Sequence, residues 1–118
     1  MQSLILTFRG IERSGAVETR IREIGERLRR CNDRITFCHV TVVGGLKESV
    51  ETVAVKIHVS VPGAQIHADS VNPDGAGHTD VFLALRDAYD SARRQLQDLQ
   101  RDGRRSKLVN AAGGSVAR

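Results

Sequence analysis

The sequence predicts a single small α+β domain with the element order β-α-β-β-β-α. Two segments carry apolar residues at the helical period, and four others are rich in β-branched residues. Short connections join the last three strands, which favours an antiparallel meander, whereas a helix separates the first two strands and favours their parallel pairing. The prediction is therefore a four-stranded mixed sheet with both helices on one face.

The first two elements lie before residue 34. Residues 2–8 (QSLILTF) are apolar and predict a strand that ends before Gly10. Ser14 is a candidate N-cap for the helix that follows, and Asn32 and Asp33 end it. The apolar positions of this helix form one stripe, at Val17, Ile21, Ile24 and Leu28.

Three strands follow. Residues 35–43 (ITFCHVTVV) predict the first, and Gly44 and Gly45 open a polar connection to the second, at residues 50–61. Residues 50–61 alternate strictly, so one face should carry Val53, Val55, Ile57, Val59 and Val61. Pro62-Gly63 predicts a turn into a last strand at residues 64–71.

A loop at residues 72–79 (NPDGAGHT) precedes a second helix, for which Thr79 or Asp80 is the candidate cap. The predicted buried stripe of this helix is Phe82, Leu85, Tyr89, Ala92, Leu96 and Leu99, with Val81 and Ala88 beside it. The apolar period stops at Gly103. We therefore predict a folded domain at residues 1–102 and a basic tail without regular structure at residues 103–118.

The net charge of +4 is unevenly distributed. Residues 1–100 carry 13 Lys and Arg and 13 Asp and Glu, so the surplus lies entirely in the tail. Residues 1–34 alone carry eight Arg against five acidic residues. This pattern indicates one basic side and a basic tail, either of which could face a polyanion.

Several strings resemble the ribosome hibernation-promoting factor / ribosome-associated inhibitor family, once called sigma-54 modulation proteins. They are the opening Met1-Gln2 strand, Asp33-Arg34-Ile35, Ile66-His67-Ala68, and the helix VFLALRDAYDSARRQL with Phe82 near its start and Arg94-Gln95-Leu96 near its middle. The resemblance covers about residues 1–102.

The resemblance implies a fold related to double-stranded RNA-binding domains and a cytoplasmic protein without cofactor. Its partners would be the small ribosomal subunit and its rRNA near the decoding site, where it would compete with tRNA and mRNA. The family's long form adds a C-terminal dimerisation domain, which is absent here, so a short form is implied. Family members carry lysines along the second helix where this chain has Ser91, Asp98 and Gln100.

Arginine is the residue type most suited to bind phosphate, because its guanidinium group makes bidentate contacts. The candidate RNA-binding residues are Arg20, Arg22, Arg27, Arg30 and Arg34 near the first helix, Arg93 and Arg94 on the second, and Arg101, Arg104, Arg105 and Lys107 in the tail. The alternative for the first group, which also includes Arg29, is a solvated face balanced by Glu18, Glu23 and Glu26. Asp90 and Asp98 could neutralise the second group, and the tail could serve only solubility.

Other site classes find little support. His58 and His67 fall on neighbouring predicted strands, but no metal-binding spacing such as CxxC or HExxH occurs. No nucleophile motif surrounds any serine, and no segment is long and apolar enough to span a membrane. Few aromatic residues are available to stack on bases, with Phe37 the one candidate on the open sheet face.

Two functions follow. The first is a non-enzymatic factor that binds small-subunit rRNA near the decoding site and inhibits translation in idle cells. The second is a diverged family member with weak or no ribosome affinity that serves as a protein-interaction domain, as the missing second-helix lysines suggest. A small metal-assisted or acid/base enzyme would need a metal or a concave polar site.

Overall fold

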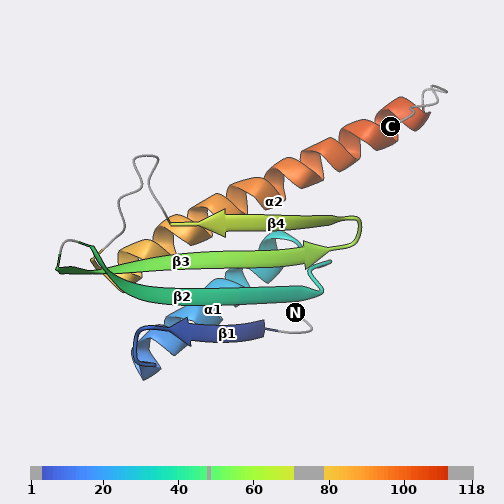
Figure 1. Cartoon of the computed structure of the whole chain (residues 1–118). Helices are drawn as coiled ribbons and strands as arrows, with labels where there is room; N and C mark the ends of the chain where they lie inside the picture. The colour runs from blue at the N-terminus through green and yellow to red at the C-terminus, as the bar shows by residue number, and fades with distance from the viewer. Residues whose placement is uncertain (1–3, 48, 71–78, 112–118) are drawn as a thin grey trace.

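The computed structural model describes residues 4–47, 49–70 and 79–111, and for residues 47 and 101–111 it describes the backbone alone. The elements are β1 (Leu4–Arg9), α1 (Gly15–Cys31), β2 (Phe37–Lys47), β3 (Val50–Val61), β4 (Ala64–Asp69) and α2 (Val81–Ala111). The strands form one sheet in the order β1-β2-β3-β4, with β1 parallel to β2 and the other neighbours antiparallel (Figure 1). The predicted fold class and strand pairing are confirmed.

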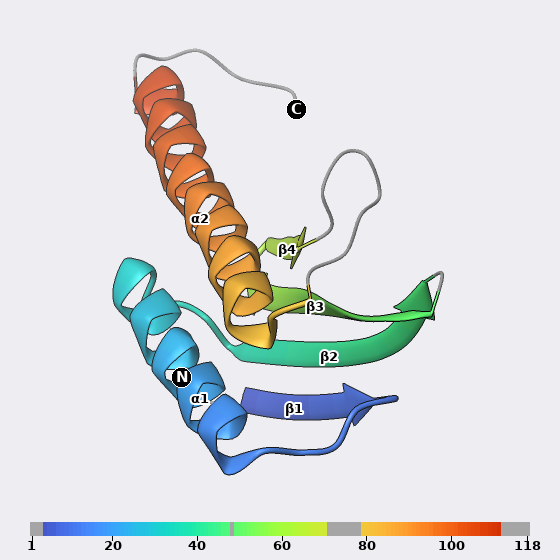
Figure 2. The same cartoon turned by 90° about the vertical axis from the view of Figure 1, so that its left-hand side faces the viewer.

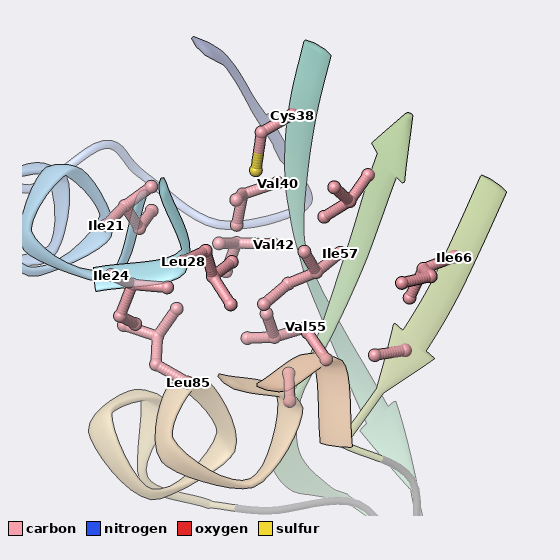
Figure 3. Close-up of a cluster of buried hydrophobic side chains, with 14 of the residues drawn as sticks. Ile21, Ile24, Leu28, Cys38, Val40, Val42, Val55, Ile57, Ile66 and Leu85 are labelled. Carbon is pink, nitrogen blue, oxygen red and sulfur yellow. The ribbon is translucent and has the colours of Figure 1, made fainter. Parts of the chain in front are cut away.

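Both helices cover the same face of the sheet and leave the other face open (Figure 2). The core lies between these two layers, where side chains of α1 and α2 meet those of β2 and β3 (Figure 3). Ile21, Leu28, Val55, Leu85 and Leu96 are at most 1% exposed. This packing confirms the alternation predicted for β3, whereas Tyr89, predicted to lie over it, is only partly buried.

The helix boundaries follow the predicted capping residues. Ser14 is the N-cap of α1, and its carbonyl accepts the Glu18 N–H at 2.9 Å, although its hydroxyl makes no cap hydrogen bond. Asn32 ends the helix and accepts the Arg34 N–H on its side-chain oxygen at 2.9 Å. At α2, the Asp80 carboxylate accepts the Phe82 N–H at 2.8 Å, so Asp80 rather than Thr79 is the cap.

The predicted end of β2 at residue 43 is wrong, because the strand continues through both glycines to Lys47. Gly44 pairs with Val53, and a Cβ atom at Gly44 would lie 2.6 Å from the Gly10 carbonyl oxygen. The glycine at position 44 therefore permits a close backbone approach within the sheet and does not mark a turn. The chain reverses later, beside Ser49, whose φ is 67°.

The turn between β3 and β4 is at Pro62-Gly63 as predicted, with Gly63 at φ 82°. Strand β4 ends at Asp69, short of the predicted residue 71. Ser70 closes this end of the sheet, because its N–H donates to the Val55 carbonyl at 3.0 Å and its hydroxyl accepts the Val55 N–H at 2.9 Å. Most of the loop predicted at residues 72–79 lies outside the described residues.

Phe82 does not belong to the buried stripe of α2, contrary to the prediction. It is 38% exposed, whereas Ala84 is fully buried. The periodicity alone could not separate these neighbours, because both lie at the edges of a stripe centred on Leu85 and Leu96. The small side chain of Ala84 is the one that the fold buries in the first turn of α2.

The second correction to α2 concerns its length. The helix runs through Gly103 to Ala111, where the sequence predicted an irregular tail, and residues 112–118 lie outside the described part. One glycine costs a helix only about 1 kcal/mol, and the Arg, Lys and Leu residues around it are good helix formers. Loss of an apolar stripe therefore did not end the helix, which extends past the sheet (Figure 1).

Candidate RNA-binding surface

The arginines of α1 and its flanks divide into two sets. The first set is paired with carboxylates in four exposed ion pairs: Arg13–Glu18 at 3.0 Å, Arg20–Glu23 at 3.2 Å, Arg22–Glu18 at 3.7 Å and Arg29–Glu26 at 2.9 Å. Such pairs contribute little to stability, but they partly neutralise the cations they contain. For this set, the alternative of a balanced, solvated face therefore describes the structure.

Two carboxylates of this set, Glu18 and Glu26, are held in their charged form. A hydrogen bond from Arg13, with the charges of Arg13 and Arg22, lowers the pKa of Glu18 below its ordinary value. A hydrogen bond from Arg29, with the charges of Arg29 and Arg30, lowers the pKa of Glu26. Both glutamates therefore remain negative near neutral pH and stay available to their arginine partners.

The second set is Arg27, Arg30 and Arg34. All three are exposed, and within the described part of the chain none has a carboxylate in ion-pair range. They gather at the C-terminal end of α1, which is anchored to α2 by a hydrogen bond from Gln100 Nε2 to the Cys31 carbonyl oxygen at 3.0 Å. This end of α1 therefore carries three exposed cations that no ion pair among the described residues holds.

The two helices lie side by side (Figure 2), and two of the candidate arginines lie on the sides where they meet. The Arg20 guanidinium lies 5.6 Å from the centroid of the Phe82 ring, which identifies those sides. Arg27 follows Arg20 by two helical turns, so it projects from the same side of α1. Arg93 lies three turns after Phe82, so it projects from the α1 side of α2, where its guanidinium lies 5.9 Å from the centroid of the Tyr89 ring.

Two further arginines of α2 lie on different sides of the helix. Arg94, a predicted RNA-binding residue, lines a hollow of about 450 Å³ beside β4 that also contains Asp87 and Asp90. Arg86 was not among the predicted site residues, yet it lies two turns before Arg93 and so on the α1 side of α2. It makes a 3.7 Å contact with Asp87. The seven-residue spacing of Arg86 and Arg93 is the signal that could have identified it.

The remaining candidates, Arg101, Arg104, Arg105 and Lys107, lie on the last part of α2, of which only the backbone is described. Their backbone is helical, where the sequence predicted an irregular tail. We use the name "arginine surface" for Arg27, Arg30 and Arg34 of the first helix region together with Arg86 and Arg93 of α2; Arg20 borders this surface but is paired with Glu23.

Other chemistry is sparse in the described residues. His58 and His67 do approach one another, with stacked rings 4.4 Å apart, but no group of three His, Cys, Asp or Glu side chains there could hold a metal ion. Burial raises the pKa of the Cys38 thiol from its ordinary value of 9.0 to about 11, which keeps it neutral and unreactive. No helix in the described segments is long and apolar enough to cross a membrane.

Comparison with known proteins bears on the family and the fold. The family model described as "Sigma 54 modulation protein / S30EA ribosomal protein" matches residues 4–103. No curated protein sequence matches significantly.

Two solved structures resemble the fold. A ribosomal subunit interface protein from Coxiella burnetii has a TM-score of 0.61 and 22% identity, covering 83% of this chain and 97% of that one. The Protein Y N-terminal domain of Thermus thermophilus has a TM-score of 0.63 and 21% identity, covering 84% and 99%. At these identities the structures support the fold, while the family model covers most of the chain. The chain therefore belongs to the sigma-54 modulation protein / S30EA ribosomal protein family.

Proposed function

We propose that this protein is a non-enzymatic, cytoplasmic factor that binds rRNA of the small ribosomal subunit near the decoding site. There it competes with tRNA and mRNA and inhibits translation in idle cells. Family membership supports ribosome association, as does the likeness to a protein named for the ribosomal subunit interface. The proposal requires no cofactor.

The observation that carries the proposal is the set of unpaired cations at the end of α1. Arg27, Arg30 and Arg34 need not give up a carboxylate partner before they meet a phosphate, so binding costs them little. Arg93 adds a fourth guanidinium from the neighbouring helix. Structured RNA is read mainly through its backbone and shape, and a rigid pair of helices that holds several guanidinium groups suits that mode.

The other candidate function is a protein-interaction domain without ribosome affinity. Two observations favour it: family members carry lysines where this chain has Ser91, Asp98 and Gln100, and four arginines around α1 are paired with carboxylates. Against it, three exposed arginines at the end of α1 have no carboxylate partner among the described residues. We therefore retain ribosome binding as the leading proposal.

Sedimentation separates the two functions. The full chain is mixed with purified small subunits at low salt, centrifuged through a sucrose gradient, and located by immunoblot. We expect it to travel with the subunits and to be displaced by excess tRNA. A chain that stays at the top of the gradient would favour the protein-interaction domain, and one that tRNA does not displace would place the site away from the decoding region.

A further inference from the structure

The open face of the sheet carries a row of three histidines. His39, His58 and His67 pair with one another in register across β2, β3 and β4. Their neighbours along each strand, such as Cys38, Val59 and Ile66, are buried beneath the helices, so the three imidazoles project from the opposite face. That face is turned toward the viewer in Figure 1, where the helices lie behind the sheet.

These rings form one aromatic array. His58 and His67 are stacked, with centroids 4.4 Å apart and planes 14° apart. Phe37, two residues before His39 on β2, meets both neighbours edge-on, with centroids 5.6 Å from His58 and 6.2 Å from His39. No element of the described structure covers the array, and His67 at its outer end is exposed.

Hydrogen bonds fix the ring orientations. His39 Nε2 lies 2.8 Å from the Thr7 hydroxyl and 3.4 Å from that of Thr41. His58 Nε2 lies 2.9 Å from Gln65 Oε1. Because the rings are held in place before any ligand arrives, a planar ligand would lose little affinity to side-chain ordering.

A hollow of about 300 Å³ opens beside the array. It is lined by His39, Thr41, Lys56, His58, His67 and Asp69. One nucleotide fits a space of this size, with a ring face for its base, a hydroxyl group for the edge of the base, and an ammonium group for a phosphate. We name Phe37, His39, His58 and His67, together with Lys56, the histidine face.

We propose that the histidine face binds an unpaired nucleotide of single-stranded RNA. The base stacks on the exposed His67 ring at the outer end of the imidazole array, and Lys56 attracts the flanking phosphate. Stacking platforms of this kind, combined with a cation for the backbone, are how open sheets take single strands. The inference rests on the proposed function for the identity of the partner, and it adds a second binding surface on the face opposite the arginine surface.

A single strand fits this face better than a protein partner does. Protein interfaces centre on buried apolar anchors, whereas among the described residues the large apolar side chain exposed beside the histidine row is Ile5 alone. The array presents the exposed ring of His67 at its outer end, which suits bases because every base has a π face. Duplex RNA cannot use the array, since its bases are already stacked on one another.

The experiment measures binding of fluorescein-labelled oligo(A) and oligo(U) octamers by anisotropy, with a short RNA hairpin as the paired control. We expect the wild-type chain to bind the octamers. The double variant H58A/H67A should weaken that binding roughly five- to 100-fold, the range found when a stacking ring is removed. The variant H58F/H67F keeps the ring faces and should retain most of the affinity.

A control is Leu83→Ala, which removes an exposed side chain on α2, on the opposite side of the sheet from the histidine face, and should leave octamer affinity unchanged. Circular dichroism confirms that each variant folds. Equal octamer affinity in the wild-type chain and in folded H58A/H67A would overturn the inference. So would loss of affinity in H58F/H67F, because charge and not stacking would then bind the strand.

Sedimentation of the same proteins with small subunits keeps the two proposals distinct. If the wild-type chain travels with subunits but binds neither octamer, the histidine face is refuted and the proposed function stands. If octamer binding depends on His58 and His67 while the chain fails to travel with subunits, the histidine face stands and the proposed function is refuted.

Discussion

Individual arginines on the helix side differ in what already surrounds them. Arg13, Arg22 and Arg29 each lie within 3.7 Å of a glutamate oxygen, whereas Arg27, Arg30 and Arg34 have no such partner in the described residues. A guanidinium that is already paired must exchange one anion for another, and that exchange gains little. The sequence predicts that all of these arginines lie on or beside the first helix, but only the folded structure shows which of them are paired with carboxylates.

The two sets allow a test at constant net charge. The variant R27E/R30E/R34E should bind small subunits at least about 100-fold more weakly, because three charge-assisted contacts become repulsive. The control R13E/R22E/R29E has the same net charge and should lose much less affinity. Filter binding measures both constants, and thermal unfolding checks the folds. Equal reductions in the two variants would mean that total charge and not local contact governs binding.

Cys38 offers a pH test of the core. Its folded pKa of about 11 lies above the ordinary 9.0, so ionisation favours the unfolded chain. The stability linked to this thiol is fully present below pH 9 and is lost as the pH rises toward 11. Urea unfolding between pH 8 and 10 should therefore show a steeper fall in the wild-type chain than in Cys38→Val. Parallel slopes would show that the thiol is not as buried as the structure has it.

Among the helices and strands, the sequence predicted what periodicity and capping residues control. Two regular patterns identified the core: the alternation of β3 and the stripe of α1 at Val17, Ile21, Ile24 and Leu28. Each pattern places its apolar residues on one face of its element, and that face packs against the other layer. The errors arose where the cause is tertiary. Strand β2 continues through Gly44 because the backbone of Gly10, a residue distant in sequence, approaches it there. The alignment of three histidines on one face depends on the register between strands.

Adjacent glycines in β2 test this explanation of the strand. Gly44→Ala would place a Cβ atom 2.6 Å from the Gly10 carbonyl oxygen, so we expect a decrease of about 1–3 kcal/mol in the free energy of unfolding. Gly45→Ala meets nothing closer than the Thr52 hydroxyl at 3.9 Å and should change stability by about 0.5 kcal/mol or less. Denaturant titration of both variants measures the difference. Equal stabilities would argue for a turn at Gly44, as the sequence predicts.

Over the molecule as a whole, the surplus positive charge lies outside the folded layers. Residues 1–100 are neutral overall, and the surplus lies beyond them, where α2 extends past the sheet. In the proposed function, the folded layers would supply local contacts through the arginine surface, while the end of the chain would supply most of the long-range attraction toward RNA.

Truncation after Asp102 tests this division. It removes Arg104, Arg105, Lys107 and Arg118, none of which belongs to the described core. The melting temperature should barely change, whereas affinity for small subunits at low salt should fall. For every phosphate group that the shortened chain no longer binds, the slope of log affinity against log salt should decrease by about 0.7–0.9. An unchanged slope would reduce this segment to a solubilising appendage.

Binding at the decoding site can be probed directly with a thiol that the structure places beside the arginine surface. Cys31 is half-buried at the end of α1, next to Arg30, whereas Cys38 is fully buried and its thiol is neutral. An iron chelate coupled to Cys31 generates hydroxyl radicals that cut nearby RNA, and C31S gives the background. We expect cuts in small-subunit rRNA clustered around the decoding site and suppressed by tRNA. Cuts no stronger than in C31S, or scattered over the subunit surface, would contradict the proposed function.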